Sequence, residues 1–255
     1  MKIHTAPSIE YLLCTFPNQL KCGHWYFRGV KDSSYDLTPS LGRQSKFNCS
    51  TSLDTKQRME RSMIADFKAR SRPLIDYYMP GTEWEWLALA QHHKLPTRLL
   101  DWSNNLLSAL YFASEKTIKY DGTFEDYTSD ECAIYLLHTE DLIPVEDVCY
   151  DPIICDKIGI VATAHVSKRM SGQSGVFSIQ TDPCISFDKL FEDDENRKYI
   201  IKFIIPHELR ENLFTTIHRL GVRAVSIYPD LDGLSSEIRQ MQELGCSQIQ
   251  NVSPD

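Results

Sequence analysis

The sequence predicts one α+β domain with a helical N-terminal portion. Helix-like segments, with apolar residues three or four positions apart, occur together with strand-like runs of β-branched and aromatic residues. The 255 residues, 42% of them apolar, are enough for a hydrophobic core of ordinary composition. No internal repeat and no linker rich in Gly or Ser divides the chain, so we expect residues 1–255 to form a single domain.

In the first hundred residues these patterns predict three helices and one strand. The helices cover residues 8–16, 54–71 and 83–93, and the strand covers residues 25–30. Ser8 is suited to cap the first helix, because its hydroxyl can accept a backbone N–H of the first turn. Pro96 disfavours helical backbone before it and ends the third helix. Residues 37–43 are expected to form a loop.

The rest of the chain predicts further strands and helices. Strands are expected over residues 133–138, 175–179, 199–205 and 224–227, and helices over residues 104–117, 207–220 and 234–243. Residues 97–101 suit a short strand or a loop, and residues 182–196 an acidic loop or a short helix. Ser103 or Asn104 is expected to cap the helix that begins beside them, because both side chains can accept a backbone N–H.

Charge is distributed unevenly along the chain. The net charge is −8, but residues 1–120 carry 16 basic against 11 acidic residues, and residues 121–255 carry 11 against 24. Residues 43–72 hold eight cations, namely Arg43, Lys46, Lys56, Arg58, Arg61, Lys68, Arg70 and Arg72. Such a cluster could attract the phosphates of a nucleic-acid acceptor, or it could be a solvated helix face, and both interpretations stay open.

Cysteine spacing, hydropathy and missing motifs disfavour several classes of protein. The eight Cys include no CxxC pair, so we expect buried thiols and no metal site. No apolar run is long enough to cross a membrane, and the first residues lack a signal-peptide core, which predicts a cytoplasmic protein. P-loop, GxGxxG, HExxH and GxSxG motifs are missing, which disfavours P-loop enzymes, Rossmann dehydrogenases, zincins and α/β hydrolases.

Residues 90–103 bring together many chemically versatile side chains. Arg98 and Asp101 are spaced to pair with each other, and Trp102 offers a face on which nicotinamide or a base could stack. Ser103 precedes a helix, whose N-terminus favours an anion. Polar groups beside an apolar helix are costly to bury unless they are paired or used. This stretch is therefore the first candidate for a functional site, although each of these side chains could instead serve the fold.

The same stretch contains two neighbouring histidines, and a third group of candidates lies outside it. His92 and His93 titrate near neutral pH, but on a helix they point about 100° apart, so at most one faces a given cleft. Arg28 follows three aromatic residues and could hold a phosphate with two hydrogen bonds, or form a buried ion pair. Gln173 lies between two glycines and could bridge sugar hydroxyls, or belong to an ordinary turn.

Two carboxylates near the C-terminus suggest a weaker site. Asp230 and Asp232 precede Gly233, a spacing that could bind a metal ion, but the pattern does not continue as in an EF-hand. The alternative is that Asp232 caps the last helix and Asp230 orients the turn before it.

Four segments together resemble the FRG domain family. They are Phe27-Arg28-Gly29, then Pro39-Ser40-Leu41 with Arg43, then Gln91 to Trp102 with Ala109 to Ala113, and finally Gln173 to Phe177. The resemblance spans residues 20–235, roughly, and its central motif is specific. The family is named for the Phe-Arg-Gly motif and not for a reaction.

The order of these segments also resembles that of ADP-ribosyltransferases, which bind NAD in a split β-sheet. There, a first strand supplies Arg or His followed by Gly, a second strand supplies a small polar residue and leads into a helix, and a later strand begins with a catalytic Glu. Arg28 with Gly29, then Thr97 to Ser103, and then Gln173 resemble these three elements in order. The resemblance implies an ADP-ribosyltransferase-like split-sheet core.

The resemblance also implies roles for single residues. Arg28 would hold the diphosphate or the nicotinamide ribose of NAD, and Trp102 or Tyr111 would stack on nicotinamide. Gln173 occupies the position of the catalytic Glu but cannot act as a base. Three alternatives stay open: Asp101 takes that part, the acceptor needs little activation, or the enzyme is inactive. The remaining residues implied to bind NAD are Phe27, Gly29, Thr97, Arg98 and Ser103.

The function implied is transfer of ADP-ribose from NAD to RNA, DNA or protein, by a toxin or phage-defence effector that an antitoxin protein would inhibit. The alternative is a non-catalytic module that binds a nucleotide or a partner, which Gln173 in place of Glu favours. A nuclease built on His92, His93 and Asp101 ranks third, because no metal cluster is recognisable beside them.

Overall fold

Seven strands form one mixed sheet that runs through the middle of the molecule. The computed structural model describes residues 1–20, 25–44, 51–75, 79–116, 127, 129–138, 149–162, 175–191 and 200–244. The strands are β1 (Lys2–Thr5), β2 (Trp25–Val30), β3 (Leu100–Ser103), β4 (Cys132–His138), β5 (Gly159–Val161), β6 (Gly175–Ile179) and β7 (Ile200–Ile205). Their order in the sheet is β1-β7-β4-β2-β3-β6-β5. Among the described strands, only β1 and β7 pair in parallel.

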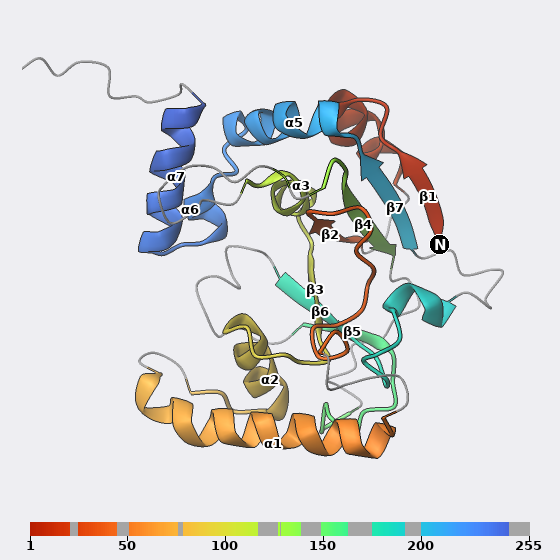
Figure 1. Ribbon diagram of the computed structural model, residues 1–255, viewed down its shortest axis with the longest axis vertical. Coiled ribbons are helices and arrows are strands. Elements are labelled where there is room, and N and C mark those ends of the chain that lie inside the picture. Colours follow the sequence, from red (N-terminus) through yellow and green to blue (C-terminus); the bar gives the residue numbers. More distant parts are fainter. Residues whose placement is uncertain are drawn as a thin grey trace, which may run out of the picture.

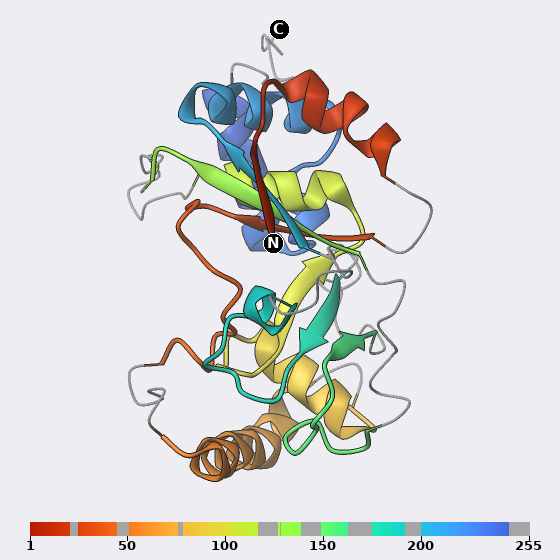
Figure 2. The same ribbon diagram turned by 90° about the vertical axis from the view of Figure 1, so that its right-hand side faces the viewer.

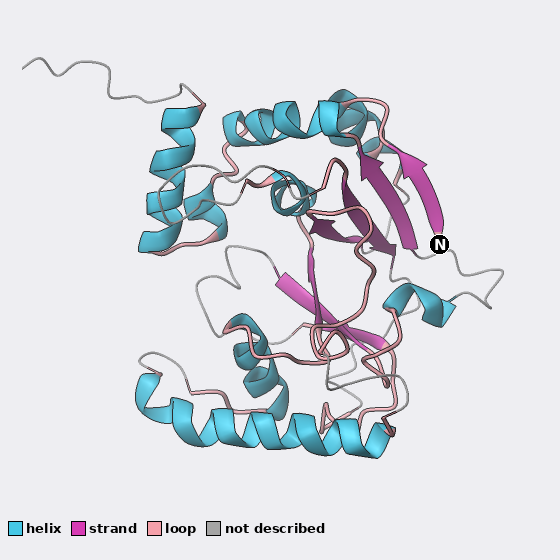
Figure 3. Cartoon of the chain, in the orientation of Figure 1, coloured by secondary structure: helices cyan, strands magenta, loops and turns pink. Residues whose placement is uncertain are grey.

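Helices cover this sheet at both ends (Figure 3). They are α1 (Leu53–Ser71), α2 (Glu83–His92), α3 (Leu106–Ser114), α5 (His207–Arg219), α6 (Ala224–Ile227) and α7 (Leu231–Glu243). Shorter helical turns cover Tyr11–Thr15, Pro17–Gln19, Arg72–Leu74 and Phe187–Phe191. The α+β class predicted from the sequence is confirmed.

The sheet consists of two groups of strands that meet at a narrow junction. β2 pairs with β4 through six opposed residues, from Trp25 to Val30, but with β3 through a single pair, Phe27 opposite Ser103. In Figures 1 and 2, β1, β7, β4 and β2 form an upper group, while β3, β6 and β5 run toward the lower end. We call this meeting of β2 and β3 the junction.

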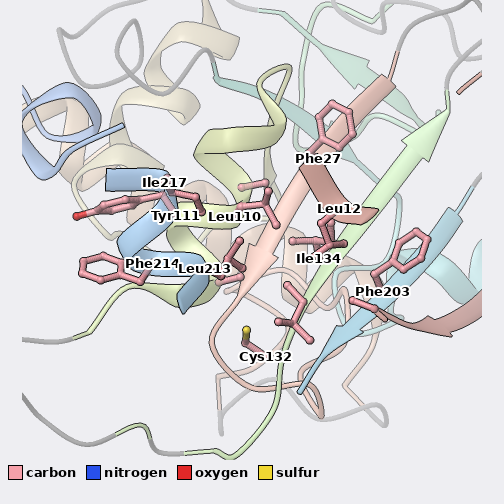
Figure 4. Close-up of a cluster of buried hydrophobic side chains, with 14 of the residues drawn as sticks. Leu12, Phe27, Leu110, Tyr111, Cys132, Ile134, Phe203, Leu213, Phe214 and Ile217 are labelled. Atoms are coloured by element: carbon pink, nitrogen blue, oxygen red, sulfur yellow. The ribbon is translucent and has the colours of Figure 1, made fainter. Parts of the chain in front are cut away.

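Each group of strands has its own helical cover. α3 and α5 pack on the upper group, where Phe27, Leu110, Ile134, Leu213 and Ile217 belong to one buried cluster (Figure 4). α1 and α2 lie at the lower end, and their apolar residues pack with those of β5 and β6.

Gly29 allows α3 to approach β2 closely. A Cβ atom at this position would lie 1.8 Å from the carbonyl oxygen of Ala109 and 2.7 Å from the backbone nitrogen of Ala113. Both contacts are with backbone atoms, which cannot swing aside as a side chain could. The glycine of the Phe-Arg-Gly motif is therefore explained by helix packing.

Most of the predicted elements are confirmed, with changes at their ends. The predicted helix over residues 8–16 forms as helical turns, and Ser8 Oγ accepts the backbone N–H of Tyr11 as expected. It is preceded by β1, so the N-terminal portion is not helical throughout. β3 begins at Leu100, later than the expected 97–101. β5 lies in a stretch where the sequence shows no clear period.

Three predictions about the helices are wrong. Residues 224–227 form α6 and not a strand, because Ala224 and Ile227, one helical turn apart, are the residues that become buried. Asn105, rather than Ser103 or Asn104, caps α3, since its Oδ1 accepts the backbone N–H of Leu107. Asp230, not Asp232, caps α7, because its carboxylate accepts the N–H of Gly233.

Candidate functional site

Arg28 and Asp101 face each other at the junction between the two groups of strands. Arg28 Nη1 donates a hydrogen bond of 2.7 Å to the carbonyl oxygen of Asp101, and lies 3.7 Å from Asp101 Oδ2. The Arg28 side chain is 18% exposed and that of Asp101 56%. One largely covered cation thus lies beside one accessible carboxylate.

A chain of hydrogen bonds fixes the Asp101 carboxylate from the other side. Gln91 Nε2, from the last turn of α2, donates to Asp101 Oδ2 over 2.9 Å. Gln91 Oε1 in turn accepts the hydroxyl of Thr97 over 2.7 Å, and Thr97 Oγ1 accepts the backbone N–H of Leu99. Each member has a defined partner, so the orientation of this carboxylate is set before any ligand arrives.

Residues 39–41 hold the segment around Thr97 in place. Ser40 Oγ accepts the backbone N–H of Thr97 over 3.1 Å, and Leu41 N–H donates to the Thr97 carbonyl oxygen over 3.0 Å. Two sequence segments far apart in the chain, Pro39-Ser40-Leu41 and the central motif, are therefore parts of one structural unit next to Asp101.

The Arg28 guanidinium has an unused hydrogen-bonding capacity. Burial lowers the pKa of Arg28 from its ordinary value, the Asp101 carboxylate acts in the opposite direction, and the positive charge of Arg43 lowers this pKa further. Arginine nevertheless stays protonated, because its ordinary pKa is far above neutrality. Among the described residues, the buried Nε of Arg28 finds no hydrogen-bond partner. A buried donor of this kind calls for a water molecule or a ligand.

The expected pairing of Arg98 with Asp101 is wrong. Arg98 instead pairs with Glu60 of α1, with Nε and Nη2 both 2.7 Å from Glu60 Oε2, and both side chains are fully buried. The backbone N–H of Arg98 also donates to Glu60 Oε1. The competing carboxylate lies 38 positions away in the chain, so local spacing could not indicate it. Through this ion pair, Arg98 attaches α1 to the segment that leads into β3.

Other residues expected to touch NAD lie inside the protein. Trp102 is 3% exposed, and its indole N–H donates to Ser178 Oγ. Tyr111 is fully buried beside Phe214, where its hydroxyl donates to Glu115 and accepts from Gln240 (Figure 4). Neither ring presents a free face for stacking.

The smaller candidates also serve the fold. Thr97 is fully buried, Ser103 is 4% exposed and Phe27 is 7% exposed. Ser103 Oγ accepts the backbone N–H of Asn105 at the start of α3. These residues support the junction without being exposed at it.

The remaining candidates are Gln173 and the two histidines at the end of α2. Gln173 lies outside the described residues, two positions before β6 begins at Gly175. His92 is the last residue of α2 and His93 is its C-cap, and their rings contact each other edge-on with centroids 5.0 Å apart. Sequence reasoning missed Gln91 as a site residue, although its position directly before these histidines in the central motif could have drawn attention to it.

Four of the eight cations expected to form a basic face contact carboxylates. Lys56 contacts Asp182, Arg61 contacts Asp151, Lys68 contacts Glu83 and Arg58 contacts Asp54. Arg43, Arg70 and Arg72 are exposed, and Lys46 lies outside the described residues. Much of the positive charge on α1 therefore attaches this helix to the domain.

No metal cluster and no membrane span occur in the part of the chain that the structure describes. Its His, Cys, Asp and Glu residues form no group of three or more that could hold an ion. None of its helices combines the length and the apolar character needed to cross a bilayer.

Comparison with known proteins identifies one part of the chain. Residues 23–122 match the model of the FRG domain. The matched range contains Arg28, Ser40, Gln91 and Asp101, and it ends before the segment Gln173 to Phe177. Comparisons with curated proteins and with solved structures gave no match.

Proposed function

The chain carries an FRG domain over residues 23–122, and from this premise we propose that it is an NAD-dependent ADP-ribosyltransferase with its site at the junction. The observation that carries the proposal is the Arg28 side chain, a covered cation beside an accessible carboxylate, whose buried Nε has no hydrogen-bond partner among the residues that the structure describes. A guanidinium in such a position suits a diphosphate, which can take two parallel N–H donors.

The arrangement of the strands supports the same proposal. Arg28 and Gly29 lie on β2, the segment from Thr97 to Ser103 includes β3, and Gln173 comes two positions before β6. These three strands are neighbours in the sheet, in the order β2-β3-β6. β2 and β3 are joined by one residue pair, which leaves the sheet divided where Arg28 lies. A divided sheet with an arginine on its first core strand is what the resemblance to the transferases implies.

In this proposal Asp101 receives the proton of the acceptor. The glycosidic bond between nicotinamide and C1′ of the ribose breaks, and its electron pair leaves with nicotinamide. The nucleophilic atom of the acceptor forms the new bond to C1′ and passes its proton to Asp101 Oδ1, while Gln91 holds Oδ2. The carboxylate also favours the positive charge that develops at C1′.

The stacking partners expected from the sequence are not part of the proposal, because Trp102 and Tyr111 are buried. Arg28, Asp101 and Gln91 are its central residues, and Gln173 stays a candidate through its position in the sequence alone. The exposed Arg43, Arg70 and Arg72 would attract an RNA or DNA acceptor. A role as a toxin or phage-defence effector with a protein antitoxin completes the proposal.

Release of nicotinamide from NAD tests this function. Wild-type protein and Arg28→Ala are each incubated with NAD, alone and with cellular RNA, DNA or protein. Release by the wild type that Arg28→Ala abolishes supports the proposal, and the fraction that becomes labelled identifies the acceptor. Arg58→Ala, which removes an exposed cation on α1, is the matched control and should keep full activity. NAD left intact in every mixture would contradict an enzymatic role.

A non-catalytic nucleotide-binding module is the second candidate. Gln173 in the position of a catalytic Glu favours it, as does the engagement of Asp101 by both Gln91 and Arg28. Calorimetric titration with NAD separates the two candidates. Binding that depends on Arg28 without any release of nicotinamide would identify a binding module.

A further inference from the structure

Arg43 is a second cation beside the junction. Its positive charge lowers the pKa of Arg28, so the two guanidinium groups lie close enough to repel each other. Asp101 Oδ2 lies 3.7 Å from Arg28 Nη1 and supplies one negative charge. Two positive charges and one negative charge therefore meet at this place, and the positive charge in excess favours an anion.

The backbone of Arg43 has a fixed position next to the site. Two positions before it, the N–H of Leu41 donates to the carbonyl oxygen of Thr97 over 3.0 Å, and Thr97 belongs to the hydrogen-bonded chain that orients the carboxylate of the site. Gly42 packs against the segment after β6, since a Cβ atom there would lie 1.8 Å from the Pro183 carbonyl oxygen. The turn is thus held from both sides, and Arg43 itself is exposed.

Arg43 also differs from the cations that serve the fold. Lys56, Arg61 and Lys68 each contact a carboxylate. Within the part of the chain that the structure describes, no carboxylate lies at ion-pair distance from Arg43. Like charges held close together are unfavourable unless an opposite charge compensates them. An anion bound to both Arg28 and Arg43 would remove this repulsion.

We propose that Arg28 and Arg43 bind one diphosphate group between them, with the inner phosphate on Arg28 and the outer phosphate on Arg43. This inference rests on the site proposed above and adds Arg43 to it as a residue that determines specificity. The ligand class is a diphosphate ester, and the expected consequence is discrimination against the corresponding monophosphate.

A diphosphate matches this pair of cations better than a single phosphate does. Each guanidinium has a planar fork of N–H donors that can hold two oxygens of one phosphate. Two linked phosphates can occupy both arginines, whereas a monophosphate engages one and leaves the other without an anion. Arg28 is largely covered and Arg43 is exposed, which places the first deeper in the site than the second. The diphosphate group occurs both in NAD and in nucleoside diphosphates such as ADP.

Calorimetric titration of the full chain with ADP, AMP and NAD tests this proposal. Wild-type protein should bind ADP at least about tenfold more tightly than AMP, the factor typical of one further hydrogen bond to a charged group. In Arg43→Ala the affinity for ADP should fall to that for AMP, while the affinity for AMP should not fall. Arg70→Ala is the matched control, because it removes another exposed arginine, near the end of α1, and should keep the preference for ADP.

The stability of Arg43→Ala without ligand separates binding from a role in the fold. The substitution removes a positive charge that repels Arg28, so the unfolding midpoint should not fall. A residue that merely supported the turn would lower the midpoint when it is removed.

The same titrations decide between the two sources of the diphosphate. NAD bound more tightly than ADP identifies the dinucleotide as the ligand, and NAD bound equally or less tightly identifies a nucleoside diphosphate. Three results would overturn the inference: wild-type protein that binds neither ADP nor NAD, wild-type protein that binds ADP no more tightly than AMP, or Arg43→Ala that keeps the wild-type preference.

Failure of this inference can be told from failure of the proposed transferase. Binding of ADP or NAD that depends on Arg43, without any release of nicotinamide, would support the diphosphate site and contradict the transferase. Release of nicotinamide by Arg43→Ala with the KM for NAD of the wild type would support the transferase and overturn the part assigned to Arg43.

Discussion

Glu60 and Arg98 form an ion pair in which neither side chain is exposed to solvent. The two side chains are fully buried, and Arg98 Nε lies 2.7 Å from Glu60 Oε2. Removal of one partner leaves an uncompensated buried charge, which typically costs about 3–5 kcal/mol. We therefore expect Glu60→Gln to lower the free energy of unfolding, measured in urea, by an amount of this order.

A double variant checks the cause of this effect. Glu60→Met combined with Arg98→Met removes both charges, and should be more stable than Glu60→Gln. Arg58→Ala, which breaks an exposed pair on the same helix, should change stability by only about 0.3–0.5 kcal/mol. Equal losses at Arg58 and Glu60 would mean that burial of the pair has no energetic consequence.

Gly29→Ala should destabilise the domain although it adds one methyl group. The new Cβ would lie 1.8 Å from the carbonyl oxygen of Ala109, so α3 would have to move away from β2. Overpacking of this kind typically costs about 1–3 kcal/mol. In the control Gly81→Ala, the Cβ would meet only Glu85 Oε2 at 3.8 Å, and the unfolding midpoint should stay the same. A midpoint for Gly29→Ala equal to that of the wild type would show that α3 can retreat freely.

His218 should make the stability of the domain fall in acid. It is 3% exposed, and burial lowers its pKa from the ordinary value of 6.5, an effect that Arg223 strengthens and Glu237 opposes. Below pH 6.5 the unfolded chain therefore binds a proton that the folded chain does not. Folding is weakened as the pH falls from the unfolded value toward the lower folded one.

Unfolding midpoints at pH 7.5 and pH 5 measure this contribution. The loss between the two values should be smaller in His218→Gln than in the wild type. His207→Gln, which replaces an exposed histidine at the start of α5, should keep the wild-type difference. The prediction is wrong if His218→Gln loses as much stability in acid as the wild type does.

Most helices and strands could be predicted because the patterns that mark them are local. The predictions of secondary structure fail where contacts between residues far apart in the sequence determine the conformation. The four residues of β1 are all exposed, and pairing with β7 alone makes them a strand. Residues 224–227 have the composition of a strand, but the neighbours that cover Ala224 and Ile227 select a helical turn.

The candidate site was predictable in part for the same reason. Arg28 and Asp101 were identified by residue type, but their contact joins positions 73 apart in the chain and follows from the order of the strands. Trp102 has the chemistry of a stacking residue, and nothing in its neighbours along the chain indicates that its side of β3 is covered.

Arg28→Lys should fail to replace the arginine. Lysine keeps the positive charge, but it lacks the planar fork that can hold the Asp101 carbonyl oxygen and a diphosphate at once. We expect turnover of NAD to fall by at least about 100-fold, the loss typical of one misplaced or missing charged contact at a reacting centre. The affinity for NAD, measured by calorimetry, should fall in parallel. Full activity in Arg28→Lys would show that only the charge matters.

Asp101→Asn separates the proposed proton-accepting role of the carboxylate from its role in the fold. The amide keeps the size of the side chain and its oxygen can still accept from Gln91 Nε2, so the unfolding midpoint should change little. An amide cannot take up the proton of the acceptor, and loss of such a base typically lowers the rate by about 10²–10⁴-fold. We therefore expect a large fall in kcat for ADP-ribose transfer with an almost unchanged KM for NAD.

Gln91→Leu provides the complementary test. This variant leaves the Asp101 carboxylate intact but removes the donor that orients it, so the expected fall in kcat is smaller than in Asp101→Asn. Because Gln91 acts through Asp101, the double variant should be no slower than Asp101→Asn alone. Effects that instead multiply in the double variant would mean that Gln91 touches the substrate directly.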